Sequence, residues 1–129
     1  MSVPFRLVGL DHVVLRAREP RGLVAFYRDV LGCTVEREQP DFALVQLRAG
    51  RSLIDIVGPR EAADSERGNM DHLCLRIEPF DLGVLRAHLR HHAIDPGEAG
   101  RRYGAEGEGP SLYLADPEGN IVELKGPPG

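Results

Sequence analysis

The sequence predicts an α+β fold in which two tandem βαβββ motifs form a cupped half-barrel. The first observation is a repeated hexapeptide: residues 11–16 read DHVVLR and residues 71–76 read DHLCLR, so both fit D-H-x-x-L-R. The second is a repeated closing segment: residues 54–59 read IDIVGP and residues 122–127 read VELKGP. Such self-similarity indicates that one supersecondary unit occurs twice. Each motif therefore opens with a strand that carries a histidine and ends with a strand that carries a carboxylate.

The first repeat contains one predicted helix and three further strands. Over residues 20–31, apolar residues recur at helical spacing: Leu23, Phe26, Tyr27, Val30 and Leu31. Pro20 suits the first turn of this helix, and Gly32 suits its end. Strands are expected at residues 33–38, 42–47 and 52–57.

The second repeat follows the same order. A helix is expected at residues 81–92, where Asp81 can cap the first turn and three leucines mark the buried face: Leu82, Leu85 and Leu89. Strands are expected at residues 96–98, 111–114 and 120–125, with a turn at residues 116–119, which read DPEG. The stretch rich in Gly and Glu at residues 97–110 is expected to be a mobile loop.

Length and composition indicate one globular domain over residues 1–129, with repeat one at about 8–59 and repeat two at about 70–127. A net charge of −4 with interspersed signs makes nucleic acid an unlikely partner, because phosphate binding needs clustered Lys and Arg. No apolar run is long enough to span a bilayer, and residues 1–9 do not read as a signal peptide. We therefore expect a cytoplasmic protein, in which Cys33 and Cys74 are free, buried thiols.

Four residues at matched places in the repeats are candidate metal ligands: His12, Asp55, His72 and Glu123. Asp55 lies on a strand that is otherwise apolar on both faces, and burying a lone carboxylate costs several kcal/mol. Two imidazoles and two carboxylates suit Mn, Fe, Co, Ni or Zn. Each residue alone is more often structural, but their paired positions favour a shared metal site.

Two arginines share a strand face with these histidines, four residues after each. Arg16 and Arg76 are candidates for contact with an anionic substrate. The alternative is a charged strand end in water.

The chain resembles the vicinal oxygen chelate superfamily, also called the glyoxalase / bleomycin-resistance / extradiol-dioxygenase superfamily. The resemblance runs from Leu10 to Gly126 and rests on four segments: LDHVVL, AFYRDVLGCTVE, MDHLCLRI and YLADPEGNIVEL. It is strongest to small glyoxalase I-like lyases. It implies a divalent metal bound by His12, His72 and Glu123, with Asp55 as a fourth ligand. A Glu is usual at the position of Asp55 in glyoxalase I, so a three-ligand site stays open.

The resemblance implies a metal-dependent lyase or isomerase, similar to lactoylglutathione lyase, that acts on a small oxygen-chelating substrate such as a thiol conjugate. Glu123 is the expected base, with Asp55 second, and Tyr103 in the Gly-rich stretch is expected to contact substrate. The alternatives are an Fe(II) ring-cleaving dioxygenase, a thiol transferase, and a non-catalytic drug- or metabolite-binding module like the bleomycin-resistance proteins. The family also implies a homodimer.

Overall fold

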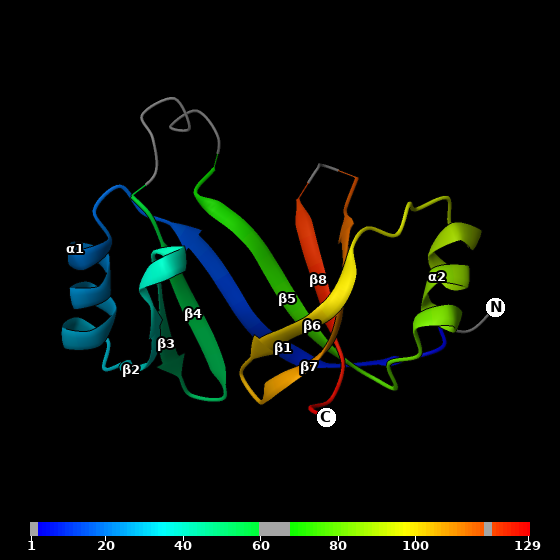
Figure 1. The fold of residues 1–129 in the computed structure, drawn as a ribbon, viewed down its shortest axis with the longest axis horizontal. Helices are drawn as coiled ribbons and strands as arrows, with labels where there is room; N and C mark the ends of the chain where they lie inside the picture. The colour runs from blue at the N-terminus through cyan, green and yellow to red at the C-terminus, as the bar shows by residue number, and fades with distance from the viewer. Residues whose placement is uncertain (1–2, 60–67, 118–119) are drawn as a thin grey trace. The chain divides into compact units, whose positions relative to one another are not determined.

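A computed structural model describes residues 3–59, 68–117 and 120–129 of the chain. Its contacts divide the chain into two compact units (Figure 1). The first-repeat unit comprises His12–Asp71, and the second-repeat unit comprises Met1–Asp11 together with His72–Gly129. Strand β1 (Arg6–Arg16) contributes to both units.

The first-repeat unit has the predicted order of strand, helix and three strands. After β1 come helix α1 (Pro20–Ala25), the π-helix η1 (Phe26–Val30), β2 (Thr34–Gln39), the short 3₁₀ helix η2 (Pro40–Phe42), β3 (Leu44–Ala49) and β4 (Ser52–Val57). The strand order is β2-β3-β4-β1, with β4 parallel to β1 and the other pairs antiparallel. The three predicted strands are thus confirmed, with bounds that shift by at most two residues.

The predicted helix at residues 20–31 is correct in its start and its end but not in its form. Pro20 opens α1, and Gly32 follows the helix with φ +83°. From Phe26 onward the helix widens, and Leu31 N–H donates to Phe26 O across five residues. The wider turn shifts later side chains out of the 3.6-residue register. Val30 and Leu31, which continue the apolar spacing in the sequence, are exposed.

The core of this unit lies between the helix and one face of the sheet. Val24 of α1 packs there with Leu47 of β3 and Ile56 of β4. Side chains alternate along a strand, so the neighbours of these residues point to the opposite face. That helix-opposed face carries both His12 and Asp55, which are buried.

The second-repeat unit repeats this architecture. It contains β5 (Met70–Glu78), α2 (Leu82–His91), β6 (Ala99–Gly104), β7 (Gly107–Ala115) and β8 (Ile121–Lys125). The strand order is β5-β8-β7-β6, with β5 and β8 parallel and the other pairs antiparallel. Asp81 caps α2 as predicted, since its Oδ1 accepts a hydrogen bond of 3.1 Å from Val84 N.

The stretch predicted as a mobile loop, residues 97–110, is instead most of a β-hairpin. β6 and β7 pair from Ala99 with Leu112 to Gly104 with Gly107, around a two-residue turn at Ala105 and Glu106. Gly107 has φ +108°, a conformation that favours glycine. The hairpin escaped prediction because its strands are rich in Gly and carry charged residues on both faces, so they show no alternation of apolar and polar residues. The strand expected at 96–98 begins only at Ala99. Of the predicted turn at residues 116–119, Glu118 and Gly119 lie outside the described residues.

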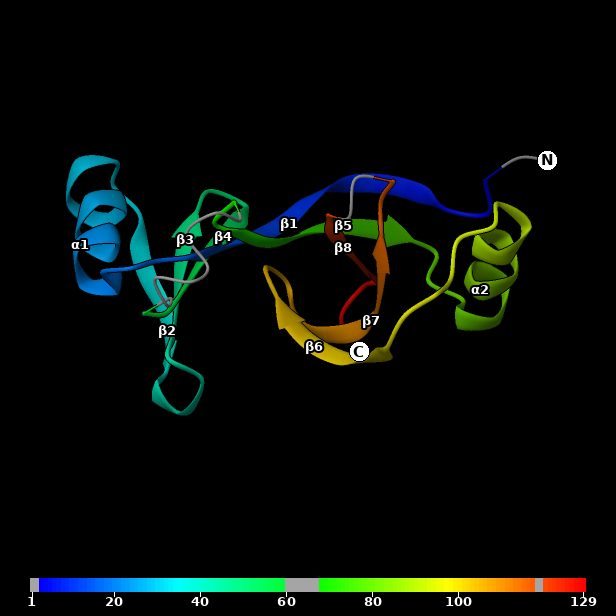
Figure 2. The same ribbon diagram turned by 90° about the horizontal axis from the view of Figure 1, so that it is seen from above.

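The two faces of this second sheet differ sharply in chemistry. Ile77, Leu112 and Leu124 face α2 and pack on Leu85 and Leu89. The helix-opposed face carries the alternate residues, which are mostly polar: His72, Cys74, Arg76, Arg102, Ser111, Tyr113, Glu123 and Lys125. Figure 2 shows that the sheet of this unit curls strongly from β5 round to β6, and most of this polar face is buried.

Two further expectations concern the whole chain. Cys33 and Cys74 are free and buried, as predicted. Within the described residues, no helix has both the length and the apolar character that a membrane span requires.

Candidate metal centre

His72 and Glu123 form a close pair of candidate ligands within the second-repeat unit. Glu123 on β8 lies opposite Cys74 on the parallel strand β5, and His72 precedes Cys74 by two residues on the same face. His72 Nε2 lies 3.2 Å from Glu123 Oε1, and the side chains are 12% and 1% exposed. An ionised carboxylate buried to this degree is stabilised by a cation beside it. Either a protonated His72 or a metal ion would be such a cation.

His12 and Asp55 occupy the equivalent face of the first-repeat unit. His12 lies opposite Leu53 on β4, and Asp55 lies opposite Val14 on β1. Asp55 Oδ2 accepts a hydrogen bond of 3.2 Å from Gln46 Nε2 on the neighbouring strand β3. Each repeat thus places one histidine and one acid on its helix-opposed face. That all four bind a single ion stays a prediction.

The donors fit a borderline divalent cation. Imidazole nitrogen and carboxylate oxygen are the ligands that Mn, Fe, Co, Ni and Zn accept together. The approach of His72 Nε2 to Glu123 Oε1 brings one donor of each kind close enough for a single ion. The thiol of Cys74 is buried directly across from Glu123, on the same face.

The charged ends of the repeated D-H-x-x-L-R motif pair with each other. Arg76 Nη2 donates to Asp11 Oδ1 at 3.0 Å, and this pair is buried. Arg16 Nη1 donates to Asp71 Oδ1 at 2.8 Å, with side chains 30% and 40% exposed. The aspartate of each copy therefore binds the arginine of the other. These guanidinium groups have protein partners, and their expected contact with substrate stays a prediction.

Asp11 also anchors the turn of the β6–β7 hairpin. Its Oδ2 accepts a hydrogen bond of 3.0 Å from Ala105 N, and Arg76 Nε lies 2.9 Å from Glu106 Oε1. The hairpin is consequently fixed at its tip. Tyr103 lies on β6 on the face opposite to His72 and Glu123, since it pairs with Glu108. Its predicted contact with substrate gains no support from this placement.

Three residues beside His72 and Glu123 were not anticipated from the sequence. Tyr113 lies directly opposite Glu123 on β7, and its ring meets that of His72 edge-on at 5.4 Å between centroids. Arg102 lies over the Tyr113 ring at 4.4 Å, and Lys125 is 1% exposed on the same face. The alternation in residues 111–114, which read SLYL, is the signal that places Ser111 and Tyr113 on the polar face.

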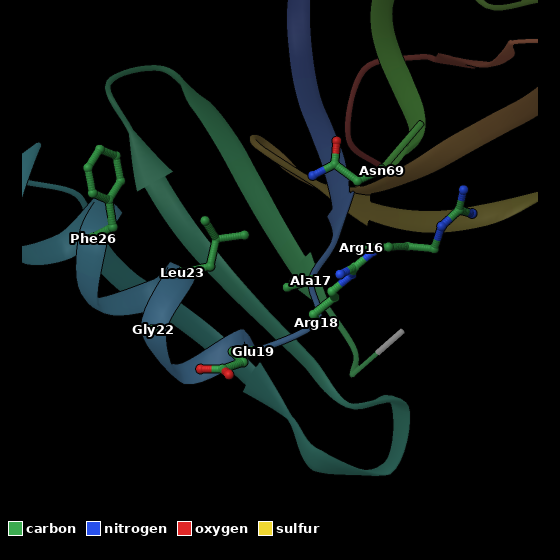
Figure 3. A pocket seen from close by; sticks show the side chains of 8 residues that line it. All are labelled: Arg16, Ala17, Arg18, Glu19, Gly22, Leu23, Phe26 and Asn69. Atoms are coloured by element: carbon green, nitrogen blue, oxygen red, sulfur yellow. The ribbon is translucent and has the colours of Figure 1, made fainter. Parts of the chain in front are cut away.

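A hollow of about 460 Å³ lies within the first-repeat unit beside α1 (Figure 3). Leu23 and Phe26 of the helix line one side of it, and Arg16 and Asn69 lie across from them. The lining is mainly apolar, with guanidinium groups at its edge. Arg16 thus both lines this hollow and binds Asp71.

The chain is similar in sequence to known proteins. A family described as a glyoxalase-like domain matches residues 12–124. The biphenyl-2,3-diol 1,2-dioxygenase 3 of Rhodococcus globerulus is 29% identical over 121 residues, which are 90% of this chain. The match covers 62% of that relative, so the chain spans less than two thirds of its length.

Solved structures agree on the fold. A methylmalonyl-CoA epimerase from Mycobacterium tuberculosis matches 100% of this chain and 94% of its own, with a TM-score of 0.67 and 20% identity. The Mn(II)-bound glyoxalase from Novosphingobium aromaticivorans matches 93% of this chain and 38% of its own, with a TM-score of 0.73 and 24% identity. The predicted α+β fold of two βαβββ motifs is thereby confirmed.

Proposed function

The chain belongs to the glyoxalase-like domain family of the vicinal oxygen chelate superfamily, and on that premise we propose that it is a divalent-metal-dependent lyase or isomerase. Its substrate would be a small molecule that chelates the metal through two oxygens, with a thiol conjugate as one option. A fold alone hosts many chemistries. The proposal therefore rests on the site rather than on the architecture.

The observation that carries it is the buried contact between His72 and Glu123. His72 Nε2 and Glu123 Oε1 lie 3.2 Å apart, and the Glu123 side chain is only 1% exposed. These two potential metal ligands are therefore already largely removed from water. The Mn(II) of the Novosphingobium aromaticivorans glyoxalase supports a metal in this family.

The proposed ligands are His12, His72 and Glu123, with Asp55 as a fourth candidate. His12 is included because the repeat makes it the counterpart of His72. Asp55 is the counterpart of Glu123 and has Gln46 as a hydrogen-bond partner. A carboxamide donor of this kind can orient a ligating carboxylate.

The proposed chemistry is a proton transfer next to a chelated substrate. A divalent cation at the site would supply Lewis-acid stabilisation of negative charge on the substrate oxygens. Glu123 would take and return the proton, with Asp55 as the second candidate for that role. The burial of Glu123 keeps water away from this carboxylate.

A second candidate is ring cleavage by Fe(II) and O₂. The specific support is the 29% identity to a biphenyl-2,3-diol 1,2-dioxygenase over 90% of this chain. A 2-His-1-carboxylate set made of His12, His72 and Glu123 suits non-haem iron as well as a lyase metal.

One assay separates the two candidates. Protein loaded separately with Mn, Fe(II), Co, Ni or Zn is offered the hemithioacetal of methylglyoxal and glutathione, and in parallel biphenyl-2,3-diol with O₂. The proposal predicts thioester formation that Glu123→Gln abolishes and that Glu108→Gln, an exposed acid on β7, leaves intact. Oxygen uptake with Fe(II) alone would favour the dioxygenase, and activity of neither kind in metal-loaded protein would reject both.

We further propose a cytoplasmic homodimer. Both statements derive from the sequence and its family resemblance. Light scattering after size-exclusion chromatography tests the dimer, and a mass of 14.2 kDa would identify a monomer instead.

A further inference from the structure

The helix-opposed face of the second-repeat unit brings cations from three strands together, beside the acids Asp11, Glu106 and Glu123. Three cations lie there: Arg76, Lys125 directly opposite it on β8, and Arg102 on β6. Arg76 is paired with Asp11 and Glu106. The remaining buried acid on this face, Glu123, lies beside His72.

Lys125 is a buried cation in a slot that two glycines leave open. A Cβ at Gly104 would lie 2.7 Å from Lys125 Cε, and a Cβ at Gly109 would lie 3.0 Å from its Nζ. Within residues 3–59, 68–117 and 120–129, no carboxylate forms an ion pair with Lys125. A buried cation favours an anion nearby, and the Asp11 carboxylate borders this slot, since a Cβ at Gly104 would overlap its Oδ2.

Arg102 is the cation on this face that a ligand can reach. Its side chain is 23% exposed and lies over Gly100 and the ring of Tyr113. Nη1 donates to Ser111 Oγ at 2.5 Å, and Ser111 in turn lies directly opposite Lys125. Arg102 also forms an ion pair of 3.7 Å with Glu98, which is 83% exposed, and a surface pair of this type contributes little. The guanidinium is thus held in place with donors left for a ligand.

We propose that Arg102, backed by the positive charge of Lys125, binds a carboxylate group of the substrate. A guanidinium presents a planar pair of donors that matches a carboxylate. Ser111 fixes that fork, and Tyr113 supports it from below through a cation–π contact. This interaction selects an acid over a neutral molecule of the same shape.

The geometry also limits the distance between the substrate's carboxylate, at Arg102, and the part of the substrate that lies at His72. The Arg102 guanidinium is 4.4 Å from the Tyr113 centroid, which is 5.4 Å from the His72 centroid, so the two ends lie within about 10 Å. If His72 binds the metal, as the proposed function holds, the substrate's carboxylate lies within about 10 Å of the His72 ring, and its chelating oxygens are bound near the same ring. The substrate class is then a small oxygenated carboxylic acid.

Binding to the metal-free protein tests the carboxylate site without the proposed function. The probes are phenylacetate and its neutral isostere phenylacetamide, titrated while amide shifts are followed by NMR. We expect the acid to bind at least about tenfold more tightly, because a charge-assisted hydrogen bond contributes that much. The shifts should centre on Arg102 and Ser111. Arg102→Gln should remove the preference, and Arg102→Lys should restore part of it.

The control is Arg101→Gln, an exposed arginine on the other face of β6, which should keep the full preference. Lys125→Met should reduce the preference for the acid, and its NMR spectrum should remain that of a folded protein. Equal affinities for acid and amide, or an equal loss in the Arg101 and Arg102 variants, would overturn the proposal. Metal content measured on the same samples separates the carboxylate site from the proposed metal-dependent function. A preference for the acid without metal uptake would reject only the metal enzyme. Metal uptake without a preference for the acid would reject only the carboxylate site.

Discussion

At the scale of single residues, the repeated D-H-x-x-L-R motif separates into structural and chemical parts. Its aspartates and arginines form two ion pairs, Asp11 with Arg76 and Asp71 with Arg16. Its leucines, Leu15 and Leu75, pack against the two cores. The histidines are the members left for the proposed metal chemistry.

The two ion pairs should differ greatly in their effect on stability. Arg76→Met leaves the carboxylate of Asp11, 1% exposed, without its cation, and removing one partner of a buried pair costs about 3–5 kcal/mol. Arg16→Met removes the equivalent cation from a pair in contact with water, which contributes about 1 kcal/mol or less. Urea unfolding of both variants measures the difference. Equal losses would contradict the burial assigned to Asp11.

The sequence identified these residues but not all of their roles. The repeat drew attention to Arg16 and Arg76, and the substrate contact expected of them remains untested, while the structure gives each an aspartate partner. An ion pair between residues 65 positions apart leaves no local signal in a sequence. Arg102, Tyr113 and Lys125 were overlooked for a related reason: they gain meaning only when β6, β7 and β8 align.

At the scale of elements, helices and strands with a regular apolar pattern were predicted correctly, whereas strands rich in polar residues were not. The strand at 52–57 was predicted from its apolar residues, and the helix capped by Asp81 from its capping residue. The β6–β7 hairpin was expected to be a loop, because it is rich in Gly and carries charged residues on both faces. The change from α1 to η1 at Phe26 has no marker in the apolar spacing.

Gly104 is the position at which the hairpin most closely approaches the rest of its unit. A Cβ there would lie 2.8 Å from Lys125 Cδ and would overlap Asp11 Oδ2. Overpacking of this kind costs about 1–3 kcal/mol, so Gly104→Ala should lower the free energy of unfolding by about that amount. Gly100→Ala on the same strand meets only the guanidinium of Arg102, at 3.4 Å or more, and should cost far less. If both variants unfold alike in a thermal melt, the close approach at Gly104 is refuted.

At the scale of the whole molecule, the fold follows from the repeat and from family membership. Each unit buries its helix against one sheet face and turns the other face, with its histidine and acid, away from that helix. The match of the family over residues 12–124 and of a solved structure over the full chain agrees with this architecture. Substrate and metal identity depend on individual side chains, which is why the repeat alone could not supply them.

The central claim is that His12 and His72 bind one divalent metal ion. The most direct test is elemental analysis of untagged protein after it has been offered Mn, Fe, Co, Ni or Zn. We predict about one ion per chain in the wild type, because the proposed ligands His12, His72 and Glu123 together make one site. The His12→Ala/His72→Ala variant should lose the ion, whereas His91→Ala/His92→Ala, which removes two exposed histidines of the α2 end, should retain it. A wild type that binds none of these metals, or equal loss in both double variants, would contradict the account.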